Sequence, residues 1–292
     1  MKTNNLLSHR NQEPERSVLY IVGTPIGNLN DVSKRALNIL NNVSMIACED
    51  TRKTSALLNY YEITNKLISF HEYSSLKKAA FLISKLKEGS SIALVSDAGM
   101  PLISDPGFML VKEAKNNNID VICIPGPCAA LAALISSGLD SSRFIFYGFL
   151  PREGKERGFL LKNINNSRMT SIVYESPKRI IKLLLELKNE CGGLRELVVV
   201  KELTKKYEKH FGGNINDALM NIKESEPKGE FTLVISGNNK EDDANSEYDL
   251  KKDLINLISA GLSHKAASNY LAQKSGKSKN LIYKLLLKNQ LK

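Results

Sequence analysis

The sequence lacks a long apolar run. The longest extends only from Cys128 to Ile135, whereas a membrane-spanning helix needs roughly 18 residues. Residues 1–16 are polar apart from Met1, Leu6 and Leu7, so the apolar core of a secretory signal peptide is missing as well. We therefore expect a cytoplasmic protein that is neither secreted nor inserted in a membrane.

Cysteine and histidine are scarce and unpaired. The four cysteines are Cys48, Cys123, Cys128 and Cys191, and none of them stands in a C-x-x-C pair. The four histidines are scattered along the chain. Structural zinc sites draw on closely spaced ligand pairs, so the pattern predicts reduced thiols and no bound metal.

The rest of the composition is that of a globular protein with an excess of positive charge. Hydrophobic residues make up 42% and charged residues 25% of the 292 residues, so the chain can bury a large core without metals or disulfides. Lysine and arginine number 41 against 31 acidic residues, which gives a net charge of +10. This charge weakly favours an anionic partner such as RNA.

Short β-rich runs alternate with helical patterns through most of the chain. This alternation is typical of an α/β architecture with largely parallel sheets, and the number of runs fits two sheets better than one. We expect strands over residues 18–22, 45–47, 67–70, 92–95, 121–124, 144–146, 171–174, 196–200 and 231–235, and helices over 32–40, 76–86, 110–116, 129–136, 178–188 and 215–223.

Changes in the character of the sequence suggest the domain boundaries. The first break falls between Pro125 and Arg143, and a polar stretch without apolar periodicity follows Ile235. We expect a polar extension over residues 1–16, a first α/β domain over 17–127, a second over 128–240, a linker over 241–249 and a helical tail over 250–292.

The tail has the pattern of three short helices. Ser263 and Ser278 each follow a glycine-containing break and are well placed as helix N-caps. From Ser263 onward the chain carries seven lysines and no acidic residue. Three helices of which the last is basic resemble a helix-turn-helix nucleic-acid module, although a solvated amphipathic cap would show a similar pattern.

Unusual loops follow several of the expected strands. In an open parallel sheet, ligands bind outside the carboxyl ends of the strands. The run from Ser96 to Gly107 contains two aspartates, two prolines and two glycines, and a stiff loop of this kind favours a ligand wall over a plain turn. The loop after residues 18–22 contains Gly23 and Gly27 but no G-x-G-x-x-G pattern, which disfavours a dinucleotide site.

Further strand ends carry charged residues. They are the runs Glu49-Asp-Thr-Arg52, Tyr174-Glu-Ser-Pro-Lys-Arg179 and Glu202-Leu-Thr-Lys205. Each run could be an ordinary strand-to-helix transition in which the acid caps the helix. Their shared position at carboxyl strand ends gives equal support to a functional role.

These motifs, in their order along the chain, resemble the tetrapyrrole methylase superfamily. Within it they are similar to the cytidine 2′-O-methyltransferases of small-subunit ribosomal RNA. The resemblance rests on the charged runs above together with Thr24-Pro-Ile-Gly-Asn-Leu29, Ser96-Asp-Ala-Gly-Met-Pro-Leu-Ile-Ser-Asp-Pro-Gly107, Pro125-Gly-Pro-Cys-Ala-Ala130 and Gly148-Phe-Leu-Pro151.

The resemblance implies a fold, a cofactor and partners. The fold is α/β, with two domains of tetrapyrrole-methylase type, S-adenosylmethionine in the cleft between them, and a small helix-turn-helix-like tail. The implied substrate is a cytidine in the decoding region of 16S ribosomal RNA, within the assembled small subunit, and the implied oligomer is a homodimer. By motif, the cofactor wall comprises Pro25, Asp97, Ala98, Gly99, Met100, Pro101, Cys128, Ala129, Leu150, Tyr174, Leu203 and Thr232.

The reaction implied by the resemblance calls for a base and for groups that position the substrate. A ribose hydroxyl is a poor nucleophile while it is protonated, so a carboxylate near it is expected. Glu175 and Asp50 are the preferred candidates, with Glu49 and His71 as further ones. Arg52 and Lys205 are expected to position the hydroxyl or a phosphate. We expect RNA contacts from Arg179, Lys265, Lys277, Lys279 and Lys284.

The sequence is also compatible with two other functions. The same scaffold serves methyltransferases that act on porphyrinoids, although the basic tail and the loop from Thr24 to Leu29 argue against that branch. A non-catalytic RNA-binding factor could also keep the fold as a scaffold, although intact loops at the strand ends argue against it.

Overall fold

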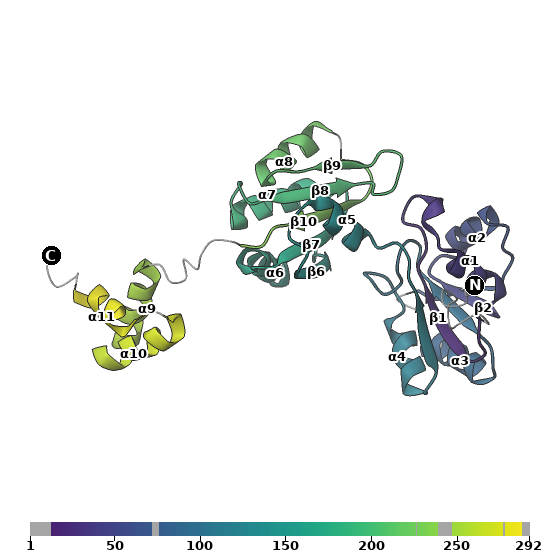
Figure 1. The fold of residues 1–292 in the computed structure, drawn as a ribbon, viewed down its shortest axis with the longest axis horizontal. Helices are drawn as coiled ribbons and strands as arrows, with labels where there is room; N and C mark the ends of the chain where they lie inside the picture. Colours follow the sequence, from purple (N-terminus) through teal and green to yellow (C-terminus); the bar gives the residue numbers. More distant parts are fainter. Residues whose placement is uncertain (1–12, 72–75, 226, 239–246, 277, 288–292) are drawn as a thin grey trace, which may run out of the picture. The chain divides into compact units, whose positions relative to one another are not determined.

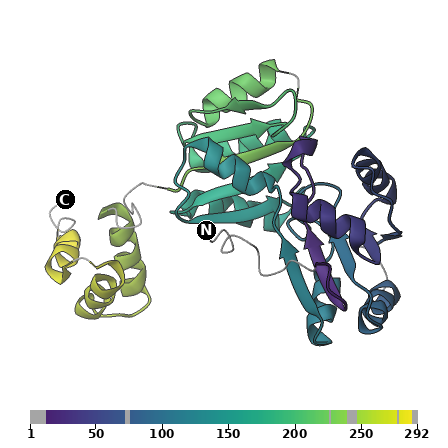
Figure 2. The same cartoon turned by 45° about the vertical axis from the view of Figure 1, so that its right-hand side comes forward.

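The computed structural model describes residues 13–71, 76–225, 227–238, 247–276 and 278–287. The chain forms two compact units, residues 1–238 and residues 239–292, which are described separately (Figure 1). The larger unit holds two five-stranded sheets flanked by helices (Figure 2). No helix of the described residues is long and apolar enough to cross a membrane.

The first sheet is entirely parallel, with the strand order β3-β2-β4-β1-β5. Its strands alternate their side chains between two apolar cores, because successive residues of a strand point to opposite faces. Tyr20 faces the core under α1 and α2, and Leu19 faces the core under α3 and α4. The elements are β1 (Val18–Val22), a 3-10 turn (Leu29–Asp31), α1 (Lys34–Asn42), β2 (Met45–Cys48), α2 (Thr51–Tyr60), β3 (Leu67–Ser69), α3 (Leu76–Lys87), β4 (Ile92–Val95), α4 (Phe108–Asn116) and β5 (Asp120–Ile124).

The second sheet has the order β6-β7-β10-β8-β9 and is mixed. Only β6 and β7 pair in parallel, and the other neighbouring strands are antiparallel. Val173 faces the core under α6, α7 and α8, whereas Ile172 faces α5. The elements are α5 (Ala129–Ser137), β6 (Phe144–Phe149), α6 (Lys155–Asn166), β7 (Thr170–Glu175), α7 (Ile180–Cys191), β8 (Leu197–Lys201), β9 (Lys209–Phe211), α8 (Ile215–Glu224) and β10 (Phe231–Ile235).

The α/β class with two sheets agrees with the sequence-based expectation, but some elements were not expected. The predicted parallel pairing holds for the first sheet and fails for most of the second. Helices α2 and α6 and strand β9 were missed. Helix α2 buries only Thr54 and Leu58, so its apolar pattern is weak. Strand β9 is a three-residue edge strand with largely exposed side chains, and such short strands show little hydrophobic periodicity in the sequence.

The C-terminal unit is a three-helix cluster formed by α9 (Glu247–Ser259), α10 (His264–Ser275) and α11 (Lys279–Leu287). Its small core contains Leu254, Leu271 and Ile282. Ser263 caps α10 by accepting a 3.2 Å hydrogen bond from the N–H of Ala266. Gly276 ends the same helix in a left-handed conformation with φ of 67°, as its lack of a Cβ allows.

Candidate functional site

The loops after β1 and β4 are joined backbone to backbone at the carboxyl end of the first sheet. The N–H of Thr24 donates to the carbonyl of Gly99 at 2.9 Å, and the N–H of Gly99 donates back at 3.1 Å. Gly99 has φ of +81°, a conformation that side-chain-bearing residues rarely adopt. The glycine therefore lets the loop after β4 turn back over the end of β1.

The loop after β5 packs equally closely on the loop after β1. A Cβ on Gly126 would lie 2.7 Å from the Cα of Gly23, and a Cβ on Gly23 would lie 2.6 Å from the Cα of Gly126. Side chains at these positions would force the two backbones apart. The three loops thus form one continuous wall.

The opposite wall comes from one edge of the second sheet. Phe231, at the start of β10, pairs with Glu175 at the end of β7 and with Lys201 at the end of β8. Because β10 is antiparallel to both neighbours, its beginning meets their carboxyl ends. Tyr174 and Thr232 pair with each other. They belong to the face of the sheet that α5 covers, since they alternate along their strands with residues that face the core under α6, α7 and α8.

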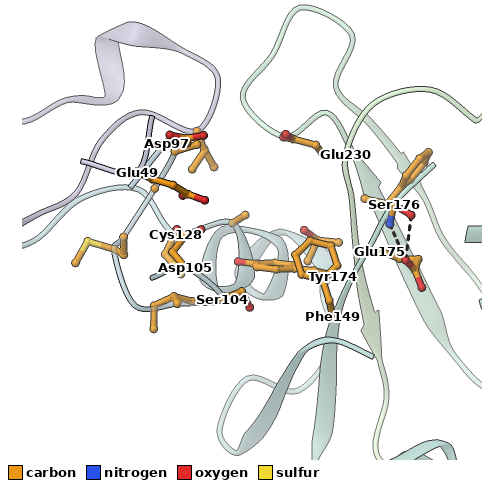
Figure 3. A pocket seen from close by; sticks show the side chains of 18 of the residues that line it. Glu49, Asp97, Ser104, Asp105, Cys128, Phe149, Tyr174, Glu175, Ser176 and Glu230 are labelled. Atoms are coloured by element: carbon orange, nitrogen blue, oxygen red, sulfur yellow. Dashed lines mark hydrogen bonds between the residues drawn. The ribbon is translucent and has the colours of Figure 1, made fainter. Parts of the chain in front are cut away.

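A cavity of about 390 Å³ lies between these two walls (Figure 3). Its lining includes predicted cofactor residues from both halves of the larger unit: Asp97, Ala98, Gly99, Met100, Cys128, Ala129, Tyr174 and Thr232. The remaining predicted cofactor residues do not line it. Pro25 and Pro101 are buried in the loops behind the wall, Leu150 is buried, and Leu203 packs against the core under α5.

Carboxylates gather on the first-sheet side of the cavity. Glu49, Asp97 and Asp105 all line it, and Figure 3 shows them on the side opposite Glu175. Asp97 is held in place because it accepts a 3.1 Å hydrogen bond from the N–H of Asp50 and pairs with Lys53 at 2.7 Å. Burial raises the pKa of Asp105 to about 6, and the nearby charges of Glu49 and Asp97 add to the shift.

Tyr174 crosses the middle of the cavity beside Phe149 (Figure 3). Its hydroxyl accepts a 2.9 Å hydrogen bond from the N–H of Ala130. Its ring makes edge contacts with Phe146 and Phe149, at centroid distances of 5.0 and 5.6 Å. Burial raises the pKa of the Tyr174 hydroxyl well above its usual value, so this hydroxyl stays protonated and acts as a neutral hydrogen-bonding group.

Glu175, the preferred base from the sequence, lines the cavity, but its carboxylate is tied to residues at the end of β7. It belongs to the face of β7 opposite Tyr174 and is 1% exposed. Its Oε1 accepts a 2.7 Å hydrogen bond from the N–H of Ser176, and its Oε2 lies 3.0 Å from Nη2 of Arg179. Arg179 also donates to the carbonyl of Leu150 at 2.6 Å. The structure therefore ties both Glu175 and Arg179, the latter expected on RNA, into the end of β7.

The other predicted catalytic residues lie outside the cavity. Asp50 is the N-cap of α2, where it accepts from the N–H of Arg52 at 2.9 Å, and its hydrogen bonds with the Arg52 side chain lower its pKa. The side chain of Arg52 is 88% exposed. Lys205 pairs with Glu202 at 3.1 Å and with Glu230 at 2.8 Å.

Lys205 instead lines a separate cavity of about 540 Å³. There the loop after β1 meets the loop after β8, and the N–H of Asn28 donates to Oγ1 of Thr204 at 3.1 Å. Both halves of the larger unit contribute to this contact, so it helps to join them.

Several cavity residues were not singled out from the sequence. Ser104 and Asp105 belong to the loop that was expected to form a ligand wall, in which only residues 97–101 were predicted to contact the cofactor. Phe149 belongs to the motif Gly148-Phe-Leu-Pro151, of which only Leu150 was predicted to contact the cofactor. Glu230 carries no signal beyond its place before β10. Among the described residues, no cluster of three or more histidine, cysteine or acidic side chains could hold a metal ion.

The lysines expected to bind RNA are placed in the C-terminal unit. Lys265, Lys279 and Lys284 are exposed there. Lys277 lies outside the residues that the structure describes. Among the described residues, none of the three exposed lysines forms an ion pair, whereas Lys274 pairs with Asp253 at 3.5 Å.

Comparisons with known proteins place the chain in a family. Residues 18–219 match the family model of tetrapyrrole (corrin/porphyrin) methylases. A Synechocystis protein named ribosomal RNA small subunit methyltransferase I is 44% identical over 92% of this chain and 97% of its own length. The protein of the same name from Escherichia coli O157:H7 is 41% identical over 97% of this chain and 99% of its own.

Solved structures agree on the fold. A uroporphyrin-III-C-methyltransferase from Thermus thermophilus matches 76% of this chain and 94% of its own, with a TM-score of 0.54 at 19% identity. A diphthine synthase matches 75% of this chain and 90% of its own, with a TM-score of 0.58 at 14% identity. The chain belongs to the tetrapyrrole methylase family and, within it, to the family of ribosomal RNA small subunit methyltransferase I.

Proposed function

We propose that this protein transfers a methyl group from S-adenosylmethionine to a ribose 2′-hydroxyl of a cytidine in the decoding region of small-subunit ribosomal RNA. The names of the relatives support methylation of this RNA. The observation that carries the proposal is the cavity between the two sheets, lined by acidic groups and by closely packed loop backbone.

The residues of the cavity fit S-adenosylmethionine. Ala98, Gly99 and Ala129 leave room for a flat ring against backbone and small side chains. The carboxylates of Asp97 and Glu49 suit a cationic sulfur, since opposite charges attract strongly where water is partly excluded. When bound, this cofactor supplies an electrophilic methyl group.

The protein's own residues position the reactants, which is where much of the rate of such a transfer arises. Asp97 is oriented by its contacts with Lys53 and with the N–H of Asp50. Asp50, Arg52, Glu175 and Lys205 are proposed as positioning residues, because the side chain of each is held in an ion pair with a neighbouring side chain. Glu175 and Arg179 fix the end of β7, from which Tyr174 enters the cavity.

The exposed lysines of the C-terminal unit are proposed to bind RNA phosphates, with the assembled small subunit as the substrate. Lys265, Lys279 and Lys284 have no competing acidic partner among the described residues, so their charge is available to phosphates. The resemblance also implies a homodimer, and sedimentation velocity of the full chain tests that expectation.

The proposed function is tested with small ribosomal subunits from cells that lack this protein. The subunits are incubated with the full chain and S-adenosylmethionine labelled in its methyl group, and the label is mapped by nuclease digestion. We expect label on one ribose 2′-oxygen. Asp97→Asn is the matched negative variant, and Asp120→Asn, which alters an exposed carboxylate at the start of β5, is the control that keeps activity.

Two outcomes would change this proposal. Label on a base instead of a ribose would support the ribosomal substrate but contradict the 2′-oxygen as the methyl acceptor. No label on subunits or free RNA, with the cofactor still bound, would favour a porphyrinoid substrate.

A further inference from the structure

A second cavity of about 630 Å³ lies beside the first. The two cavities share Glu49, Ser104, Asp105 and Phe149 in their linings. The second one extends from these residues toward the end of β3, the beginning of α4 and the end of β6. A molecule in the second cavity would therefore lie next to a molecule in the first.

Aromatic side chains give the second cavity its chemical character. Phe70, Phe108, Tyr147 and Phe149 line it. Phe70 is buried, but Phe108 is 65% exposed and Phe149 is 55% exposed. Exposed aromatic rings around a cavity are suited to an unpaired nucleobase, because each base has a flat face that stacks on them.

Asp105 stands where the two cavities meet. Its carboxyl faces Ser96, which hydrogen-bonds with it, and the charges of Glu49 and Asp97, which disfavour its ionisation. Burial and these charges raise its pKa to about 6. A general base works best when its pKa lies near the working pH, and this carboxylate is both ionised at pH 7 and a stronger proton acceptor than an ordinary aspartate.

We propose that the second cavity receives the target nucleoside, flipped out of the RNA, with its base against Phe108 and Phe149 and its 2′-hydroxyl at Asp105. The proposal rests on the function proposed above. The 2′-oxygen forms a bond to the methyl carbon while the carbon–sulfur bond breaks and its electron pair stays on sulfur. The hydroxyl proton passes to the Asp105 carboxylate.

A cross-linking experiment tests where the nucleoside binds. The photoreactive residue p-benzoylphenylalanine replaces Phe108 in the full chain, and the protein is irradiated with small subunits that lack the modification. Primer extension should place the cross-link at the nucleotide that the unmodified enzyme methylates, or next to it. The same substitution at Phe159, which is exposed on α6, is the control. A cross-link to a distant nucleotide, or none from position 108, overturns the proposal.

Kinetics and binding separate the second cavity from the first. Phe108 lines only the second cavity, so Phe108→Ala should leave the affinity for S-adenosylhomocysteine unchanged in calorimetry. It should raise KM for the small subunit about tenfold, the typical loss of one base–aromatic stack, and Phe108→Tyr should restore KM. Phe159→Ala is the control for an exposed aromatic. Equal KM values for Phe108→Ala and the unmodified enzyme would overturn the proposal.

The role of Asp105 has a separate readout. Asp105→Asn should bind S-adenosylhomocysteine and small subunits normally but reduce kcat by at least about 100-fold, the usual contribution of a general base. A variant that keeps kcat would overturn this role. If the unmodified enzyme itself fails to methylate subunits, it is the proposed function that fails, which distinguishes the two.

Discussion

The hydroxyl of Tyr174 accepts a hydrogen bond of 2.9 Å from the N–H of Ala130, and this contact joins strand β7 to the first turn of helix α5. The first amides of a helix have no partner within the helix. Cys128, at the N-cap, makes no side-chain capping bond. Tyr174 therefore supplies this acceptor from strand β7 and fixes Cys128 and Ala129 where they line the cavity.

Tyr174→Phe should weaken both the fold and the cofactor site. The ring keeps its contacts with Phe146 and Phe149, but the N–H of Ala130 loses its acceptor. We expect the free energy of unfolding in urea to fall by about 1 kcal/mol and the affinity for S-adenosylhomocysteine to fall severalfold in calorimetry. Tyr207→Phe, at a tyrosine that is 67% exposed, is the matched control. If the two variants behave alike, Tyr174 does not position the wall.

Gly126→Ala should open the wall between the loops after β1 and β5. Its Cβ would lie 2.7 Å from the Cα of Gly23, so one backbone must move. We expect a loss of about 1–3 kcal/mol in the free energy of unfolding, as for other overpacked sites, and weaker binding of S-adenosylhomocysteine. Thermal unfolding and calorimetry measure both.

Gly158→Ala is the control for that substitution. Gly158 lies inside α6, and a Cβ there would meet no atom within 4 Å. Alanine is favoured over glycine in a helix by up to about 1 kcal/mol, so this variant should be more stable and bind normally. Two variants that were equally destabilised would contradict the close packing of Gly126 on Gly23.

Asp105→Asn should stabilise the protein at neutral pH. The pKa of Asp105 is raised from 3.8 to about 6 in the folded protein, so above pH 6 the folded state carries a carboxylate that is better hydrated in the unfolded chain. Asparagine removes this unfavourable charge. Since the group is partly exposed, we expect a gain of about 1–2 kcal/mol, less than the full 1.4 kcal/mol per pKa unit.

The pH dependence gives the sign of this effect. Wild-type Asp105 takes up its proton as the pH falls from about 6 toward 3.8, and the gain from asparagine should disappear across that window. Urea unfolding at pH 8, 7, 6 and 5 measures it, with Asp120→Asn as the control. A gain that stayed the same from pH 8 to pH 5 would mean that ionisation of Asp105 is not its cause.

The sequence predicted those parts of the fold and of the cavity that depend on local pattern. The apolar runs of β1, β4 and β10 and the loop from Ser96 to Gly107 can be recognised without tertiary information. The burial of helix α2 depends on Thr54 and Leu58 alone, and the antiparallel entry of β10 between β7 and β8 is a long-range choice. Neither leaves a local signal.

The direction in which each side chain points was harder to predict from the sequence than the position of the loops. Tyr174 and Glu175 are neighbours, so in a strand they must point to opposite faces. Both residues line the cavity, but only Tyr174 shares the face that α5 covers, and the position of α5 depends on long-range packing that the local sequence does not show. Asp105 differs from Asp97 only in its burial and its charged neighbours, and these arise from the folding of three separate loops.

The exposed lysines of the C-terminal unit should set the salt dependence of RNA binding. Each lysine that neutralises a phosphate adds roughly 0.7 to the slope of log K against log salt for single-stranded nucleic acid. Replacing Lys265, Lys279 and Lys284 together by glutamine should therefore flatten that slope by about 2. Filter binding of small subunits between low and moderate potassium chloride measures it, and the affinity for S-adenosylhomocysteine should not change.

The control for this prediction is a triple variant with the same net charge as the first one, but with the substitutions placed in the larger unit. Lys155, Lys162 and Lys188 are exposed on α6 and α7, and glutamine at these positions removes the same charge from the larger unit. Long-range attraction depends on total charge and would fall equally in both triple variants. Contacts with phosphates would be lost only in the C-terminal one, so a change of slope shared by both variants would contradict a specific role for these lysines.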